Sequence, residues 1–333
     1  MSAPGGMRRL IALMLAATLM LLPLSAQAGL TARFIDVGQG DSCLITCDGE
    51  SMLVDGGTAD SSSKLVALLG ELGIDSLRYM INTHPHDDHV GGLCGPLSVV
   101  GVDAVYANTT DYDLNRFAVF KRIAADKGLA IGTLAAGDEL RLGGASISVL
   151  APISALEDMN DNSLVLMVRY GATLLLLMGD AGAAEEQALM EAGAELDADL
   201  IKVGHHGAGS SSGAEFLEQV SPAWAVISVG ADNDFGHPHA DTLARLYAAG
   251  ARVLRTDESG TITVQSDGRT LEVTTERAAG TAAAEDYYIG NVRTHKFHRP
   301  DCGTLPAEKN RVTLDTREQA LSEGYSPCGN CRP

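Results

Sequence analysis

The stretch Thr83-His84-Pro85-His86-Asp87-Asp88-His89-Val90-Gly91-Gly92 places three imidazoles and two carboxylates within six consecutive positions. It follows an apolar run from Leu77 to Ile81, which predicts a buried strand. Side chains released from a strand end onto a loop can converge on one point, and neutral imidazole and carboxylate are ligands for zinc or manganese. The alternative is a polar loop that is merely rich in histidine. The His-x-His-x-Asp-His spacing followed by two glycines is too specific for that interpretation.

With this spacing the chain resembles the metallo-β-lactamase superfamily of hydrolases. The resemblance implies that His84 and His86 bind one metal ion, and that Asp88 and His89 bind a second. We therefore expect one or two Zn²⁺ or Mn²⁺ ions in a hydrolytic site.

Further ligands are expected where other strands end. Asp180 directly follows the apolar run from Leu174 to Met178, and the resemblance implies that it bridges both metals. An N-cap of the following helix is the alternative role for Asp180. In Lys202-Val203-Gly204-His205-His206-Gly207, His205 matches the last metal-binding histidine of the family. His206 is the alternative ligand, and we favour His205.

One ligand of the family pattern is absent from the sequence. Asn162 stands where the superfamily usually has another histidine, so the site of His84 and His86 loses a strong donor. We predict two unequal sites, with Asn162 as a weak ligand whose carboxamide oxygen suits Mn²⁺ or Mg²⁺ better than Zn²⁺. Asp55 either orients a ligand histidine or belongs to a turn with Gly56 and Gly57.

Several further motifs occur together in a fixed order and narrow the resemblance. They are Asp36-Val37-Gly38-Gln39-Gly40-Asp41-Ser42, Asn162-Ser163-Leu164, Gly179-Asp180, the Lys202 to Gly207 segment, and Asn233-Asp234-Phe235-Gly236-His237-Pro238-His239. As a set they look like the hydrolase domain of ComEC-type competence (DNA-uptake) proteins, over roughly Thr31 to Thr275. The resemblance implies a hydrolase connected with DNA uptake. Such proteins carry a membrane channel that this sequence lacks, so we expect a free-standing exported relative.

Four residues are candidates for the chemical steps. A bound metal ion lowers the pKa of water and polarises a phosphoryl or carbonyl oxygen, and Asp88 is placed to steer the attacking hydroxide. Lys202, His206 and His237 are candidates for stabilising developing charge or protonating a leaving oxygen, because each lies beside a predicted ligand or in a glycine-flanked loop. For His237, a simple turn with Gly236 and Pro238 is an equally good explanation.

The pattern of strands and helices predicts the fold class. Sets of strands, each followed by helices, favour two sheets packed face to face with helices outside, which is the α+β, four-layer αββα sandwich that the resemblance implies. We assign residues 29–275 to this hydrolase domain. Residues 276–286 are rich in alanine, glycine and threonine and are interpreted as a linker, and residues 287–333 as a small separate unit.

The C-terminal unit carries a strong zinc signal. His298-x3-Cys302 and Cys328-x2-Cys331 form a two-plus-two ligand set with no open position, which predicts a structural Zn²⁺. The region resembles the metal-binding domain of the Ada DNA-repair protein, with His298 where that family has a cysteine. Disulfides and a redox Cys-x2-Cys are the alternatives, but three cysteines cannot form two disulfides. Docking of DNA or of a protein fits this unit equally well.

The N-terminus predicts export. Arg8 and Arg9 precede an apolar run from Leu10 to Leu24 and a small-x-small cleavage site ending at Ala28, so residues 1–28 are interpreted as a cleaved signal peptide. We expect a secreted or extracytoplasmic protein, in the periplasm or cell envelope, with no stable membrane insertion after cleavage.

Charge limits the substrates that the surface can attract. The formal net charge is −19, and residues 29–286 alone carry 15 Lys/Arg against 38 Asp/Glu, a net of −23. Such a surface repels polyanions at long range and offers no basic stripe for duplex DNA. Residues 287–333 carry seven Lys/Arg against five Asp/Glu, so this unit is the better place for DNA contact.

The sequence as a whole favours a secreted metal-dependent phosphodiesterase, in particular a nuclease acting on DNA. One alternative is a hydrolase of a small ester, a lactone or a lipid-derived phosphodiester. Another is a non-catalytic DNA-binding accessory of DNA uptake. The absent histidine disfavours β-lactam cleavage.

Overall fold

The computed structural model describes residues 29–277, 288–299, 302–314 and 317–331. The predicted signal peptide, residues 1–28, lies outside the described residues. Of the predicted linker, Glu276 and Arg277 are described and bond to the main domain, since their backbone amides donate to Thr261 and Ser259. The remainder of the linker is outside the described part of the chain. None of the helices in the described ranges is long and apolar enough to cross a membrane.

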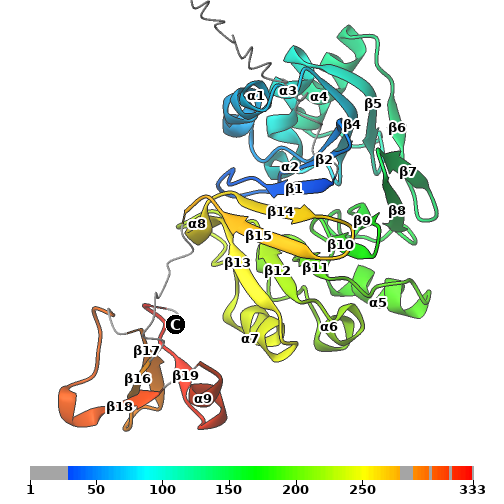
Figure 1. The fold of residues 1–333 in the computed structure, drawn as a ribbon. Helices are drawn as coiled ribbons and strands as arrows, with labels where there is room; N and C mark the ends of the chain where they lie inside the picture. The colour runs from blue at the N-terminus through cyan, green and yellow to red at the C-terminus, as the bar shows by residue number, and fades with distance from the viewer. Residues whose placement is uncertain (1–28, 278–287, 300–301, 315–316, 332–333) are drawn as a thin grey trace, which may run out of the picture.

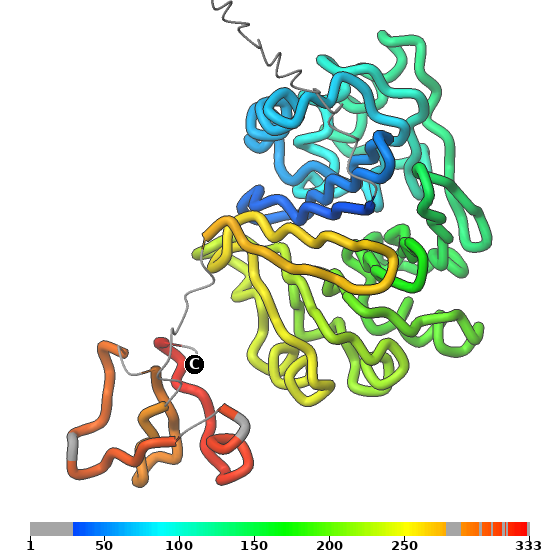
Figure 2. The backbone as a smooth tube through the Cα atoms, viewed as in Figure 1, coloured from blue at the N-terminus to red at the C-terminus, as the bar shows by residue number. Residues whose placement is uncertain are grey.

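The first sheet contains the N-terminal strands and takes in two strands from the end of the domain (Figure 1). In spatial order its described strands are β15 (Leu271–Thr275), β14 (Ile262–Ser266), β1 (Leu30–Phe34), β2 (Cys43–Cys47), β3 (Glu50–Val54), β4 (Ser76–Asn82), β5 (Gly101–Ala107) and β6 (Ile131–Thr133). Neighbours pair antiparallel from β15 to β3 and parallel from β3 to β6. Figure 2 shows β1 running beside β14, which joins the two ends of the domain.

The second sheet is built from the middle of the chain. Its described strands, in spatial order, are β13 (Arg252–Arg255), β12 (Trp224–Ile227), β11 (Leu200–Lys202), β10 (Thr173–Leu177), β9 (Val165–Tyr170), β8 (Ala145–Ala151) and β7 (Glu139–Leu142). The strands from β13 to β10 are parallel, and those from β10 to β7 are antiparallel.

Three apolar cores hold the layers together. The central core packs residues of both sheets against each other, for example Ile45 and Ile81 against Leu175 and Val226. The outer face of the first sheet is covered by α1 (Ser62–Glu71), α3 (Cys94–Val99) and α4 (Asn115–Asp126). The outer face of the second sheet is covered by α5 (Ala183–Glu191), α6 (Ala214–Val220) and α7 (Ala240–Ala248). The predicted αββα sandwich is therefore confirmed.

The sequence pattern did not predict α3, β6 or β7. Strand β6 spans three residues at the edge of the first sheet, and β7 is an edge strand in which Leu142 is the only fully buried residue. Edge strands bury few side chains, so they leave little alternation in the sequence.

The C-terminal unit has its own small sheet and core. The sheet order is β18 (Arg311–Leu314), β16 (Tyr288–Asn291), β17 (Lys296–His298) and β19 (Ser326–Pro327), with α9 (Arg317–Ser322) beside it. Its buried apolar core contains Phe297, Leu314 and Ala320. A cluster of three buried apolar side chains among the described residues is small for an independent domain, so a bound metal is expected to stabilise the fold.

The topology brings distant loops to one edge of the sandwich. Strands β3 and β4 are parallel neighbours and end just before Asp55 and His84, while β10 and β11 are parallel neighbours that end just before Asp180 and His205. Because parallel neighbours present their carboxyl ends at the same edge, the predicted ligands meet there.

Candidate metal centre

The ligand loop is held against the preceding strand by glycines. A side chain on Gly92 would place its Cβ 1.9 Å from the carbonyl oxygen of Gly56, so only glycine allows this approach. The amide of Gly56 donates to the carbonyl of His89 at 2.7 Å, and the amide of Gly92 donates to the carbonyl of Gly57 at 2.9 Å. Gly92 and Gly56 thus allow α2 (Asp87–Val90) to lie against the turn after β3, where His89 contacts Asp55.

Asp55 orients His89. The Nδ1 atom of His89 donates to Oδ2 of Asp55 at 2.9 Å, and Asp55 also accepts from the backbone amide of Thr83 at 2.8 Å and from the Thr83 hydroxyl at 2.6 Å. This leaves Nε2 of His89 directed at Asp180, 3.2 Å from its Oδ1 atom. Of the two interpretations left open for Asp55, the geometry supports the one in which it orients a ligand histidine.

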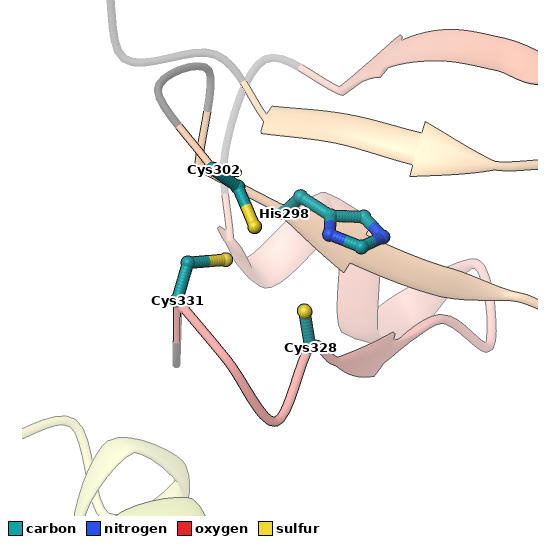
Figure 3. Close-up of side chains that lie close together, drawn as sticks. All are labelled: His298, Cys302, Cys328 and Cys331. Atoms are coloured by element: carbon teal, nitrogen blue, oxygen red, sulfur yellow. The ribbon is translucent and has the colours of Figure 1, made fainter. Parts of the chain in front are cut away.

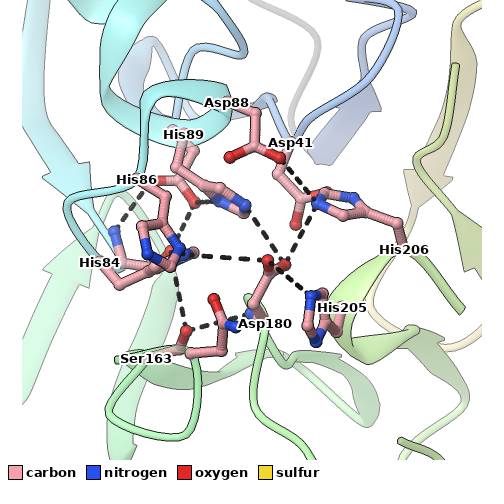
Figure 4. A network of polar contacts seen from close by, with 12 residues as sticks. Asp41, His84, His86, Asp88, His89, Ser163, Asp180, His205 and His206 are labelled. Carbon is pink, nitrogen blue, oxygen red and sulfur yellow. Dashed lines mark hydrogen bonds and ion pairs between the residues drawn. The ribbon is translucent and has the colours of Figure 1, made fainter. Parts of the chain in front are cut away.

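The turn after β11 decides how two adjacent histidines point. His205 and His206 both have left-handed backbone angles, with φ of 48° and 53°, a conformation that costs a non-glycine residue about 1 kcal/mol or more. His206 is buried, its Nδ1 donates to the carbonyl of Ser228 at 2.9 Å, and its Nε2 lies 3.3 Å from Oδ2 of Asp88 and 3.4 Å from Oδ1 of Asp180. His205 is more exposed, with its Nε2 3.9 Å from Oδ2 of Asp180. The structure therefore buries His206 between Asp88 and Asp180, while His205, which the sequence favoured, approaches Asp180 from the more exposed side (Figure 4).

A buried ion pair supports His206 from behind. Lys202 is 3% exposed, and its Nζ lies 2.9 Å from Oδ2 of Asp41 while donating to the carbonyl of Val203 at 2.7 Å. The other oxygen of Asp41 is 3.3 Å from Nδ1 of His206. Lys202 was predicted to contact a substrate. In the structure its ammonium group contacts Asp41 instead. Asp41 belongs to the Asp36 to Ser42 motif, but the sequence predicted no role for it, because Asp41 follows a glycine-rich turn and does not directly follow an apolar strand as Asp180 does.

The other half of the centre has fewer ligands. Nε2 of His84 lies 3.0 Å from Nδ1 of His86 and 3.8 Å from Oδ2 of Asp180. Behind His84, the hydroxyl of Ser163 is 3.3 Å from Nδ1 of His84 and accepts from the amide of Asp180 at 3.0 Å.

Asn162 is directed away from this half-site. Its carboxamide oxygen accepts from the amide of Leu156 at 2.9 Å, and its nitrogen donates to the carbonyls of Leu156 and Asp158 at 2.8 and 2.6 Å. The carboxamide closes its own loop, so the oxygen expected to act as a weak ligand is occupied elsewhere. The adjacent Ser163 is the residue that contacts His84.

The buried atoms of the centre fit a divalent cation. Ligand atoms of His84, His89 and Asp180 lie within 4.8 Å of one another, as do those of Asp88, His89 and His206. Among the described residues, Nε2 of His89, Nε2 of His206 and Oδ1 of Asp180 are buried and have no partner in hydrogen-bond geometry. Buried polar atoms without partners are rare, and three that face one point are what a metal ion satisfies.

Without a cation, protons balance the charge of this centre. Burial opposes a charge on His89, but the carboxylates of Asp180 and Asp55 raise its pKa well above the ordinary value. The same opposition holds for His206, whose pKa is raised by Asp180, Asp41 and Asp88. Burial and the neighbouring His89 instead lower the pKa of His84 well below its ordinary value. A cation that binds Nε2 of His89 and His206 must displace their protons.

His237 lies at the rim of the centre. Its ring is 5.5 Å from that of His205 and 6.3 Å from that of His206, measured between centroids. Burial together with the nearby His206 and His205 lowers the pKa of His237 to about 4. At pH 7 it is therefore neutral, so it can hold an oxyanion by a hydrogen bond but not by a positive charge.

A second cluster lies in the C-terminal unit (Figure 3). One ligand atom each of His298, Cys302, Cys328 and Cys331 lies within 4.8 Å of the others, and the three thiols are not joined in disulfides. The Nδ1 atom of His298 is buried without a hydrogen-bond partner among the described residues. Burial opposes ionisation of Cys328, but the amides of Cys331 and Asn330 lower its pKa to about 7. Three thiols and one imidazole around one point fit a tetrahedral Zn²⁺.

Comparison with known proteins identifies the families of both domains. The model of the metallo-beta-lactamase superfamily matches residues 35–230, and that of the metal binding domain of Ada matches residues 274–333. ComE operon protein 3 of Bacillus subtilis is 33% identical over 68% of this chain and 32% of its own length. Competence protein ComA of Neisseria gonorrhoeae is 31% identical over 68% of this chain and 31% of its own length. The chain thus spans about a third of the length of these curated relatives.

A solved structure shows the same fold as the main domain. The metallo-beta-lactamase fold protein YhfI from Bacillus subtilis superposes with a TM-score of 0.51 at 15% identity, covering 72% of this chain and all of YhfI. The family model spans more than half of the chain and includes the clustered residues from Asp41 to His206, whereas His237 lies beyond its end. The chain therefore belongs to the metallo-β-lactamase superfamily, and its C-terminal unit is a metal-binding domain of the Ada type.

Proposed function

We propose that this chain is an exported metal-dependent phosphodiesterase that cleaves DNA. The observation that carries the proposal is the convergence on Asp180 of imidazoles from two other loops, after β4 and after β11, with three buried ligand atoms that have no hydrogen-bond partner among the described residues. The names of the relatives, competence and recombination proteins, supply the link to DNA.

The ligands divide into a stronger and a weaker set. Asp88, His89, His206 and Asp180 offer four groups to one cation. His84 and His86 offer two imidazoles, with Asp180 as the shared carboxylate. We therefore propose that the first set binds a divalent ion, Zn²⁺ or Mn²⁺, more tightly than the second.

The chain's own groups position the reaction around this ion. A cation held here would lower the pKa of a water molecule and polarise a phosphoryl oxygen. Asp88 is partly exposed, so its carboxylate can orient the attacking water from the solvent side. The neutral His237 at the rim can hold a phosphate or leaving oxygen by a hydrogen bond. Lys202 takes no direct part, because it is buried against Asp41.

Because the main domain is acidic, we expect it to contact only a short segment of the substrate. A net charge of −23 over residues 29–286 repels an extended duplex, so the metal centre and the C-terminal unit would hold DNA locally. Export by the N-terminal segment and location in the cell envelope would bring the chain to incoming or extracellular DNA. The four-ligand cluster of the C-terminal unit would bind a structural Zn²⁺ that stabilises this second contact.

The test uses the protein without the predicted signal peptide, residues 1–28, reloaded with Mn²⁺ or Zn²⁺. Single-stranded DNA, duplex DNA, RNA and a chromogenic phosphodiester are offered in parallel. The proposal expects metal-dependent DNA cleavage that Asp180→Asn abolishes. Asp126→Asn serves as the matched control, because Asp126 is an exposed aspartate in α4 outside the centre.

Each other outcome points to one of the alternatives. Turnover of a lactone or a lipid phosphodiester, with no DNA cleavage in the presence of any metal, would establish the alternative function as a hydrolase of small esters or lipid phosphodiesters. Tight DNA binding without cleavage would establish the accessory role in DNA uptake.

A further inference from the structure

The most exposed aromatic ring among the described residues lies at the rim of the metal centre. Phe235 is 64% exposed, while the next most exposed large aromatic residue, Tyr247, is 37% exposed. A single exposed hydrophobic residue is common and indicates nothing by itself. The position of Phe235 relative to the centre is what distinguishes it.

Phe235 is the outer member of a row of rings that leads to Asp180. Its ring stacks on that of His237, with centroids 5.6 Å apart and an interplanar angle of 23°. The ring of His237 meets that of His205 edge-on at 5.5 Å, and Nε2 of His205 is 3.9 Å from Oδ2 of Asp180. The phenyl ring thus packs on His237 and is separated from Asp180 by the rings of His237 and His205.

The loop that presents Phe235 is held by Asn233. The carboxamide oxygen of Asn233 accepts from the amides of Phe235 and His237 at 3.2 and 3.0 Å, and its nitrogen donates to the carbonyls of Gly230 and His237 at 3.0 and 2.7 Å. Four hydrogen bonds from one side chain make the turn rigid. The ring is therefore displayed in a fixed orientation, which reduces the entropy lost when a flat partner stacks on it.

The charges around Phe235 select the uncharged part of a nucleotide. Asp232 and Asp234 lie in the same loop as Phe235 and are both exposed, so the negative charge of the loop disfavours a phosphate group at this position. A planar base carries no charge at neutral pH and stacks on an aromatic face with a gain of about 1–3 kcal/mol. A base in duplex DNA is already stacked and paired, so only an unpaired base is free to meet the ring.

We propose that the exposed face of Phe235 is a stacking subsite for an unpaired nucleobase next to the scissile phosphate. The proposal rests on the phosphodiesterase function and narrows its substrate to single-stranded nucleic acid. A short stacked contact also suits the acidic domain, since it requires no track of basic residues along the strand.

The first experiment compares two single strands that differ only in whether the positions around the cleavage site carry bases. An oligonucleotide with all its bases and one with abasic positions around the cleavage site are hydrolysed by the wild type and by Phe235→Ala. The full strand should have the higher kcat/KM with the wild type. Phe235→Ala should raise KM for the full strand about fivefold or more, which corresponds to the lower limit of about 1 kcal/mol for the stacking of one base. The two substrates should then have similar KM values.

Two further variants separate stacking from a structural role. Phe235→Tyr keeps a flat ring and should restore the preference, whereas Phe235→Leu keeps an apolar side chain and should not. Val99→Ala is the matched control, because Val99 is 65% exposed on the C-terminal end of α3 and belongs to no site. If Phe235→Leu behaves like the wild type, the ring makes an apolar contact, as with an acyl chain, and the stacking proposal fails.

A binding measurement tests the subsite without cleavage. Phe235→Trp adds an exposed indole to a chain whose single tryptophan is Trp224 in β12. A phosphorothioate-linked oligothymidylate should quench the added emission, and the abasic strand should not. Absence of quenching, together with an unchanged base preference in Phe235→Ala, would overturn the inference while leaving DNA cleavage intact. If the wild type cleaves no DNA but quenching occurs, the phosphodiesterase proposal fails and the subsite stands.

Discussion

The buried pair between Lys202 and Asp41 allows a quantitative test of the centre. The Lys202 and Asp41 side chains are 4% and 8% exposed, and the ammonium nitrogen of Lys202 lies 2.9 Å from Oδ2 of Asp41. Removing one member of a buried pair leaves a charge without compensation and costs about 3–5 kcal/mol. We expect Lys202→Met to lower the free energy of unfolding of the main domain by about 3 kcal/mol. The lower end of the range applies because His206 is 3.3 Å from Asp41 and keeps its proton in metal-free protein.

The assay is equilibrium unfolding in urea followed by tryptophan fluorescence. Trp224 in β12 is the only tryptophan of the chain, so the signal reports the main domain and not the C-terminal unit. With an m value of about 3 kcal/mol/M, the midpoint should fall by about 1 M. The double variant Asp41→Asn/Lys202→Met removes both charges and should recover most of the loss, because a neutral pair leaves no buried charge.

Two results would refute this reasoning. A loss below about 1 kcal/mol in Lys202→Met would mean that solvent or another cation compensates Asp41. A double variant that loses as much as the sum of the single variants would mean that the two residues act independently.

Three further predictions concern the metals. The affinity of the main centre for Zn²⁺ should fall as the pH is lowered, because the raised pKa values of His89 and His206 keep both imidazoles protonated and metal binding must release those protons. Calorimetry in buffers of different ionisation enthalpy measures the proton release, and an affinity that does not change with pH would contradict the prediction. His206→Ala should lose metal from this centre, measured by elemental analysis, whereas His205→Ala should retain it; the reverse order would restore His205 as the ligand. Cys328→Ser should remove one equivalent of zinc and lower the melting temperature of the C-terminal unit, while the main centre keeps its metal. An unchanged zinc content would exclude the four-ligand site.

Local patterns were enough to predict the fold and the ligand loop. Alternating and continuous apolar runs predicted most strands and helices, and the two-sheet sandwich followed from their order. The spacing from His84 to His89, and Asp180 after an apolar strand, identified groups that the structure brings within 3.2 to 3.8 Å of one another. The convergence of these groups could be predicted because the position of a side chain directly after a buried strand depends on local sequence alone.

The choice between adjacent residues was decided by the tertiary structure. Asn162 and Ser163 are neighbours, but the carboxamide closes its own loop and the hydroxyl contacts His84. His205 and His206 are also neighbours, and their left-handed backbone turns only His206 into the buried cluster. A pattern of residue types carries no record of these dihedral angles, because they are imposed by packing against distant segments.

The sequence by itself determined the fold, the ligand loop and the zinc cluster of the tail, since each is recorded in the spacing of residue types along a short segment. Only the folded chain decided which histidine joins Asp88, that Lys202 is buried against Asp41, and that Phe235 stands beside the centre. Lys202 and Asp41 come from different sheets, and a contact between them exists only once the two layers have packed. Long-range contacts of this kind follow from the three-dimensional arrangement of strands, which no local pattern encodes.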